Sequence, residues 1–253
     1  MEIIAIANHK GGVGKTATAH ALGEALADLT GLQVLLVDLD PQAGLTGACG
    51  VAGVELGLAE VFSGEASIPE ILVGLAPNLK LAPADLALAP LEMSLNNRPG
   101  RVKLLKNAFD SLGEDFDLAL VDCPPNLGLL TMNALVAADC VLVPTQPQAI
   151  DRRGLKVFLD AVKQVKESLN PSLELFGVLI TFYDHRFNHH QSAVNAMLLD
   201  GIPVLDVKIG RSIRVAEAAE RGKSIVSYDP RNPQAENYWK LAASIEAWVK
   251  SVR

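Results

Sequence analysis

The stretch HKGGVGKT, residues 9–16, decides the fold of this chain. It follows a short apolar run at residues 3–7 and precedes a segment rich in Ala and Leu, which predicts the order strand, glycine-rich loop, helix. Because glycine lacks a Cβ and tolerates unusual backbone angles, such a loop wraps closely around an anion. The N-terminus of the following helix adds a favourable dipole. The sequence therefore predicts a phosphate-binding loop.

Individual residues of this loop have distinct expected roles. We expect the backbone N–H groups of Gly12, Gly14, Lys15 and Thr16 to point at the phosphates. The Lys15 ammonium would reach the β- and γ-phosphates of a nucleotide, and the Thr16 hydroxyl would bind Mg²⁺. The predicted nucleotide-binding residues are Lys10, Gly11, Gly12, Val13, Gly14, Lys15, Thr16 and Ala17.

Two further apolar runs end in aspartate. Residues 34–40 read VLLVDLD and residues 118–125 read LALVDCPP. The carboxyl ends of parallel strands meet at one edge of a sheet, where α/β proteins place their ligands. One strand-ending aspartate alone is better read as a helix cap or turn residue. Three strands in order, each ending in a functional segment, favour a shared site whose carboxylates suit magnesium.

Length and composition indicate an α/β protein. The 253 residues are 49% hydrophobic but only 5% aromatic, so the core is expected to be aliphatic. Apolar runs with little polar alternation are typical of parallel strands covered on both faces. We expect one three-layer domain over residues 1–253, with a central, mostly parallel twisted sheet flanked by helices; length alone leaves two small domains open. No apolar run approaches a membrane span, and residues 1–2 lead directly into a strand, so no signal peptide is expected.

Strands and helices are expected to alternate along the chain. The three cysteines, Cys49, Cys123 and Cys140, lack metal-site spacing and are expected to be buried free thiols of a cytosolic protein. Residues 44–76 are expected to form a loop with short helices. Further strands are expected at residues 79–82, 140–144 and 175–181, and helices at 15–29, 101–112, 126–138, 151–169, 191–199, 212–221 and 233–252.

The phosphate loop departs from the common G-x-x-x-x-G-K-[ST] spacing. His9 occupies the first glycine position, and a second lysine, Lys10, follows it. This resembles the deviant Walker A motif of the ParA/MinD ATPases, in which that lysine crosses a dimer interface to the partner's nucleotide. The resemblance implies ATP and Mg²⁺ as cofactors and a homodimer that forms on ATP binding. A cation placed there would stabilise charge that develops on the γ-phosphate.

The resemblance covers nearly the whole chain and is closest to the Soj subgroup. It implies that Asp40 polarises the attacking water, with Lys10 and Lys15 completing the catalytic set. It also implies that Asp38 and Asp122 hold Mg²⁺, mostly through water, together with Thr16. The departures are His9, Ala17 in place of a commoner threonine, and QPQ at residues 146–148. The similar segments are residues 123–128, 130–144, 181–186 and 213–242.

Charge is uneven along the chain. Residues 201–253 hold nine Lys/Arg against six Asp/Glu, a net charge of +3, whereas the whole chain carries −7. Such asymmetry points to a face that binds a polyanion. By resemblance, Arg186 and Arg214 sit where Soj-type proteins contact DNA, and Arg211 is close enough to join them. Contacts of this kind address phosphates, so we expect non-specific binding to double-stranded DNA. The alternative is a solvated charged surface.

Several functional alternatives remain at this point. The favoured one is a partition ATPase, cytoplasmic and nucleoid-associated, whose hydrolysis a ParB-like activator or cargo adaptor stimulates. A MinD-like membrane-cycling ATPase would need an amphipathic membrane helix, whereas the apolar stripe of residues 238–253 fits a helix packed on the domain.

A relative of the nitrogenase iron protein would need paired cluster-ligating cysteines, and the three cysteines give no convincing pair. A non-enzymatic scaffold is disfavoured because the lysines, the threonine and the three aspartates occur together. Adenine contacts are expected near residues 181–184 and 228–230, by resemblance alone.

Overall fold

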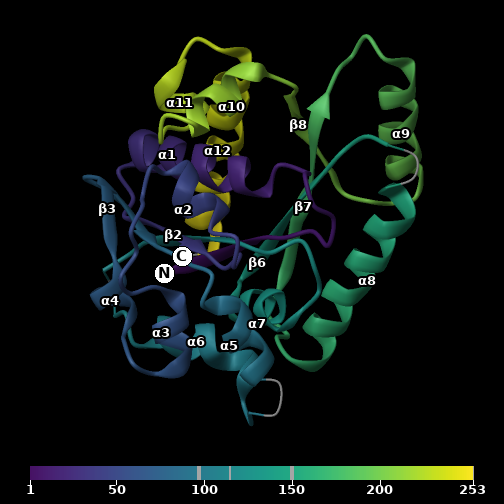
Figure 1. Ribbon diagram of the computed structural model, residues 1–253. Helices are drawn as coiled ribbons and strands as arrows, with labels where there is room; N and C mark the ends of the chain where they lie inside the picture. Colours follow the sequence, from purple (N-terminus) through teal and green to yellow (C-terminus); the bar gives the residue numbers. More distant parts are fainter. Residues whose placement is uncertain (96–97, 114, 149–150, 253) are drawn as a thin grey trace.

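The computed structural model describes all residues except 96–97, 114, 149–150 and 253. Its strands form a single eight-stranded sheet in the order β3-β4-β2-β5-β1-β6-β7-β8 (Figure 1). Neighbouring strands pair in parallel except β3 with β4, which are antiparallel. The strands are β1 (Glu2–Ile6), β2 (Val34–Asp38), β3 (Val73–Ala76), β4 (Leu79–Ala82), β5 (Leu118–Asp122), β6 (Cys140–Thr145), β7 (Glu174–Tyr183) and β8 (Val204–Gly210).

Helices cover both faces of the sheet, which gives the expected three layers (Figure 1). A short 3₁₀ turn, Arg101–Lys103, precedes α6. The helices are α1 (Lys15–Thr30), α2 (Gly44–Ala48), α3 (Leu58–Ser63), α4 (Ile68–Ile71), α5 (Leu88–Ser94), α6 (Leu104–Asp110), α7 (Leu129–Ala137), α8 (Asp151–Ser168), α9 (Asn188–Leu199), α10 (Ile213–Ala219), α11 (Ile225–Tyr228) and α12 (Pro233–Val252).

Alternation along β1 explains why both faces are buried. Ile4 and Ile6 belong to the core cluster beneath α1 and α12, whereas Ile3 and Ala5 belong to the cluster beneath α6, α7 and α8. Successive side chains of a strand point to opposite faces, so an uninterrupted apolar strand requires cover on both sides. The sequence prediction of an aliphatic, mostly parallel sheet between two helical layers is therefore confirmed.

Most predicted elements are present, with shifted ends and some additions. The expected helix at residues 101–112 is a 3₁₀ turn followed by α6, and the one at residues 126–138 begins only at Leu129. Residues 44–76 contain the expected short helices but also β3, the antiparallel edge strand. The prediction omitted α5, β8 and α11. In β8 most residues are only half-buried, so it lacks the continuous apolar run that marks the central strands.

The apolar stripe of α12 packs inside the molecule, as expected. Tyr238, Leu241, Ile245 and Val249 are buried in the cluster that also holds the inner face of α1. The three cysteines are free and buried, which confirms that prediction. Within the described residues, no helix has both the length and the apolar character that crossing a membrane requires.

Sheet order places the phosphate loop at the point where the topology reverses. The chain leaves β1 toward β2 on one side, while β6, β7 and β8 follow on the other. In open α/β sheets, ligands bind at the carboxyl ends of the strands beside such a switch point. Asp38 and Asp122, the last residues of β2 and β5, are directly paired in register, and Ile6 of β1 pairs with Asp122.

Candidate nucleotide-binding site

The phosphate loop has the backbone geometry that its glycines predict. Gly12 and Gly14 have φ of 71° and 85°, a region that side chains with a Cβ rarely adopt. Gly14 is also the N-cap residue of α1, which begins at Lys15. Neighbouring segments hold the loop, because Gln146 Nε2 donates to the Gly12 carbonyl at 2.8 Å and Thr181 Oγ1 donates to the Val13 carbonyl at 2.8 Å.

Lys15 lies inside this loop rather than in open solvent. Its Nζ donates to the Lys10 carbonyl at 3.1 Å, and only 7% of the residue is exposed. Burial lowers the pKa of Lys15 below its ordinary value, although the nearby Asp122 opposes that shift. A buried ammonium beside a ring of backbone amides is a site that an anion would complete.

The three predicted magnesium residues meet at the ends of β2, β5 and the phosphate loop. Thr16 Oγ1 donates to Asp122 Oδ2 at 2.7 Å. Asp38 Oδ2 accepts from both the backbone N–H and the hydroxyl of Thr46 at 2.8 Å, and Asp38 Oδ1 accepts from the Asp40 N–H at 3.1 Å. Asp38 is therefore held by the protein at both oxygens, whereas the Thr16 hydroxyl binds Asp122.

These carboxylates fit a cation. Both are buried, and burial raises the pKa of Asp38 to about 6. Burial, with the charge of Asp38 added, raises the pKa of Asp122 well above its usual range. Asp122 Oδ1 is buried and has no hydrogen-bond partner in the part of the chain that the structure describes. Magnesium is bound by one or two carboxylates together with substrate phosphates and retained waters, and two carboxylates with one hydroxyl suit that arrangement.

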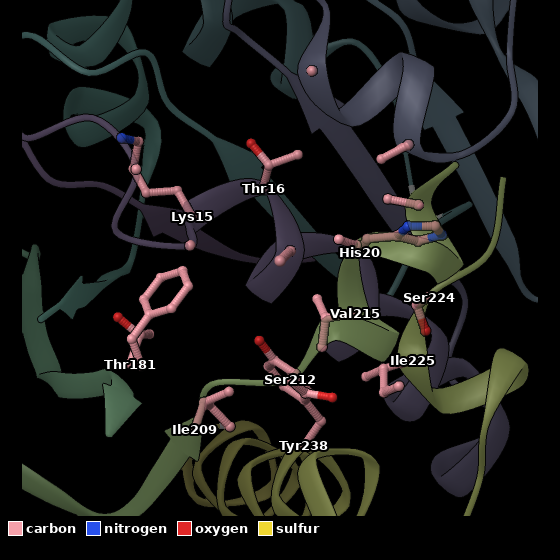
Figure 2. A pocket seen from close by; sticks show the side chains of 18 of the residues that line it. Lys15, Thr16, His20, Thr181, Ile209, Ser212, Val215, Ser224, Ile225 and Tyr238 are labelled. Atoms are coloured by element: carbon pink, nitrogen blue, oxygen red, sulfur yellow. The ribbon is translucent and has the colours of Figure 1, made fainter. Parts of the chain in front are cut away.

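A pocket of about 500 Å³ opens beside the loop and runs along α1 (Figure 2). Its inner end is lined by Gly11, Gly12, Gly14, Lys15, Thr16, Ala17 and Asp40. Asp40 Oδ1 accepts from the Gln42 N–H at 3.0 Å, which fixes the turn after β2. Of the other predicted residues, Val13 is fully buried beneath the loop, and Lys10 lies in the loop with its backbone N–H donating to Asn8 Oδ1.

Sequence reasoning missed the outer end of this pocket. Figure 2 shows His20 from α1, Ser224 and Ile225 on one side, with Val215 and Ser212 from the α10 segment opposite Thr16. Thr181 and Phe182 also line it, whereas residues 228–230, the other segment expected to contact adenine, are not among its lining residues. A His and a Glu four residues apart in an otherwise Ala- and Leu-rich helix were the available signal.

The three arginines expected to contact DNA lie in the segments that follow β7 and β8, at the same edge of the sheet. Arg186 Nη2 is 2.6 Å from Asp184 Oδ2 and holds the pKa of Asp184 below its usual range. Arg214 Nη1 donates to Glu217 Oε2 at 2.8 Å. A second pocket, of about 380 Å³, brings Arg211 and Asp184 together with Gly12 of the phosphate loop.

Comparisons with known proteins agree over almost the whole chain. A family model described as an AAA domain, AAA_31, matches residues 1–175. The sporulation initiation inhibitor protein Soj of Bacillus subtilis is 38% identical, over 97% of this chain and 98% of that protein. The chromosome partitioning protein ParA of Caulobacter vibrioides is also 38% identical, over 97% of this chain and 94% of that protein.

Solved structures give the same result. A Mycobacterium smegmatis protein described as cobyrinic acid a,c-diamide synthase, with bound ATP analog and magnesium, is 36% identical with a TM-score of 0.89, covering 100% of this chain and 97% of that one. The Pyrococcus furiosus cell division ATPase MinD is 27% identical with a TM-score of 0.81, covering 98% and 99%. The chain belongs to the AAA_31 family of AAA domains and is a ParA/MinD-type partition ATPase by descent.

Proposed function

We propose that this protein is a Mg²⁺-dependent ATPase whose nucleotide state controls binding to DNA. The observation that carries the proposal is the buried cluster of Thr16, Asp122 and Lys15 beside a glycine-rich loop. The Gly11 to Ala17 backbone would cradle the phosphates, and Lys15 would neutralise them. Thr16, Asp38 and Asp122 would hold Mg²⁺, which would supply charge neutralisation at the β- and γ-phosphates. The M. smegmatis relative with bound ATP analog and magnesium supports both cofactors.

Asp40 is the proposed group that orients and polarises the attacking water. It lies at the inner end of the pocket, two residues beyond the buried Asp38. Its Oδ1 accepts from the Gln42 N–H of the turn, and a carboxylate has further lone pairs with which it can bind a water. A positioned carboxylate of this kind contributes roughly 10²- to 10⁴-fold to a rate.

Lys10 is the residue on which the proposed dimer depends. Its backbone is fixed in the loop by Asn8, and the Lys10 carbonyl binds Lys15, so the residue is anchored beside the phosphates. We propose that in an ATP-bound homodimer the Lys10 ammonium reaches the partner's nucleotide, as the deviant motif implies. Two copies would then share the charge of two nucleotides, so dimerisation would depend on ATP.

Non-specific double-stranded DNA is the proposed ligand of the outer surface formed by Arg186, Arg211 and Arg214. The two arginines with carboxylate partners, Arg186 and Arg214, are bound by carboxylates only two or three residues away, at exposed positions where ion pairs are weak. DNA phosphates can therefore replace those carboxylates. A dimer would present the surface twice, and linked contacts raise avidity steeply. The relatives named for chromosome partitioning support this role.

The remaining proposals concern the activating partner, the location in the cell and the alternative function. We propose that a ParB-like activator or cargo adaptor stimulates hydrolysis and so releases the DNA, and that the protein is cytoplasmic and nucleoid-associated. Residues 1–253 would act as one ATPase domain around the single sheet. The second candidate is a MinD-like membrane-cycling ATPase, and the similarity to the P. furiosus cell division ATPase MinD keeps it in view. The buried apolar stripe of α12 favours the DNA-binding candidate, because that stripe is occupied by α1.

Light scattering of the purified protein with Mg²⁺ tests the proposal. With a non-hydrolysable ATP analogue the measured mass should be that of a dimer, and with ADP it should be that of a monomer. A parallel sedimentation assay with anionic liposomes separates the two candidates. A mass that does not depend on the nucleotide would contradict the ATP-dependent homodimer, and ATP-dependent liposome binding without DNA binding would favour the membrane-cycling candidate.

A further inference from the structure

The outer end of the nucleotide pocket contains a buried histidine with one unused nitrogen. His20 of α1 lines the pocket five residues beyond Lys15, yet only 4% of it is exposed. Its Nε2 lies 3.2 Å from Glu24 Oε1. Its other ring nitrogen, Nδ1, has no hydrogen-bond partner among the residues that the structure describes. Among the described residues, the fully buried side-chain atoms without a hydrogen-bond partner are His9 Nδ1 and Asp122 Oδ1, so His20 Nδ1 is accessible from the pocket, where a ligand can donate a hydrogen bond to it.

Glu24 fixes which nitrogen of His20 carries the hydrogen. Ser224 Oγ donates to Glu24 Oε2 at 2.5 Å. Burial alone would raise the pKa of Glu24, but the hydrogen bonds from His20 and Ser224 outweigh it and lower that pKa to about 2. Glu24 is therefore a carboxylate, which only accepts hydrogen bonds, so Nε2 must be the donor. In the neutral imidazole, Nδ1 is then an acceptor.

The walls around His20 suit a flat aromatic base. Ile209, Val215, Ala216 and Ile225 give apolar surfaces between α1 and the α10–α11 segment. Figure 2 shows Val215, Ile225 and His20 on the side of the pocket away from Lys15. If the phosphates bind at the loop, as the proposed function holds, the same pocket leads the nucleoside toward this end. Ligand pockets of this kind combine apolar walls with few polar groups that set specificity.

We infer that His20 is a specificity-determining residue: its Nδ1 accepts a hydrogen bond from the exocyclic amine of adenine. Guanine and hypoxanthine carry a carbonyl oxygen at that ring position, which would face another acceptor and leave both unpaired. The inference rests on the proposed ATPase function and extends it by naming the group that distinguishes the bases. Glu24 acts through His20 as a positioning residue.

Calorimetric binding at about pH 8 with Mg²⁺ tests the inference. The probes are ADP, IDP and purine riboside 5′-diphosphate, which lacks the amine but has no opposing carbonyl. The wild type should bind ADP roughly tenfold more tightly than the purine analogue, and IDP more weakly still. In His20→Val the ADP-to-purine ratio should fall to about one, while the affinity for the purine analogue changes little.

Ser212→Ala is the matched control, because it removes another polar group from the same pocket. It should keep the tenfold ratio; loss of the ratio in this variant would assign the amine to Ser212 and overturn the inference. Equal binding of ADP and the purine analogue by the wild type would also overturn it, whether or not His20→Val folds. In that case the proposed ATPase stands, whereas failure of the wild type to bind any of the nucleotides would remove the proposed function as well.

Discussion

The charged side chains at the carboxyl ends of the strands are buried, whereas those of the outer arginine surface are exposed. Asp38, Asp122 and Lys15 are 0%, 1% and 7% exposed, whereas the side chains of Arg186 and Arg214 are 76% and 56% exposed. The buried charges are positioned by strand register and by long-range hydrogen bonds such as Thr16 to Asp122. The exposed ones have partners two or three residues away.

The difference shows which functions the fold itself specifies. A buried carboxylate is expensive unless a partner or cation compensates it, so its presence at a strand end is informative. An exposed arginine costs little and needs no ligand. The edge of the sheet therefore predicts nucleotide chemistry strongly, while the arginine surface predicts DNA binding only together with the family.

The largest expected effect is at Asp40. Asp40→Ala should keep ATP binding and lower the turnover number roughly 10²- to 10⁴-fold, because the water loses its acceptor. Steady-state phosphate release and calorimetry measure the two quantities. Asp40→Asn separates chemistry from structure, since its amide oxygen can still accept from the Gln42 N–H. Wild-type turnover in either variant would remove Asp40 from the mechanism.

The burial of Asp38 should also affect how the stability of the protein depends on pH. Because burial raises the pKa of Asp38 to about 6, the folded state holds that proton more tightly than the unfolded chain. Its contribution to stability is therefore present at low pH and is lost as the pH rises through about 6. Between about pH 4.5 and 7.5 without Mg²⁺, this contribution should fall by about 2 kcal/mol.

Urea unfolding of Asp38→Asn across that pH range isolates the effect. In this variant the free energy of unfolding should fall by about 2 kcal/mol less over that pH range than in the wild type. Asp28→Asn, at an exposed position of α1, should behave like the wild type. An unchanged pH profile in Asp38→Asn would mean that this carboxylate is not held in the protonated form by burial.

The smallest expected effects are on the arginine surface. Arg214→Glu should leave the ATPase rate unchanged and weaken DNA binding roughly tenfold, because a phosphate contact is lost and a negative charge added. Glu217→Gln removes the carboxylate that Arg214 now binds and should strengthen DNA binding. Lys163→Glu on α8, which is 75% exposed, is the charge-reversal control. Fluorescence anisotropy with a duplex at several salt concentrations measures all three, and equal affinities would place the DNA-binding surface elsewhere.

The sequence predicted the buried half of the site because each of its parts is a local pattern. A glycine-rich loop after an apolar strand, and two apolar strands that end at Asp38 and Asp122, specify the layers and the ligand edge together. It could not predict β8, whose half-buried residues lack a continuous apolar run. It also missed His20, since the role of that side chain depends on Ser224, which is 204 residues away in the sequence.

The central claim is that the nucleotide at the buried edge controls the exposed surface. Binding of the wild type to a non-specific duplex, at one moderate salt concentration with Mg²⁺, should be measured with ATP, with ADP and without nucleotide. Tight binding is expected with ATP alone, and weak binding with ADP or without nucleotide. Equal binding in all three states, or no binding in any of them, would contradict it.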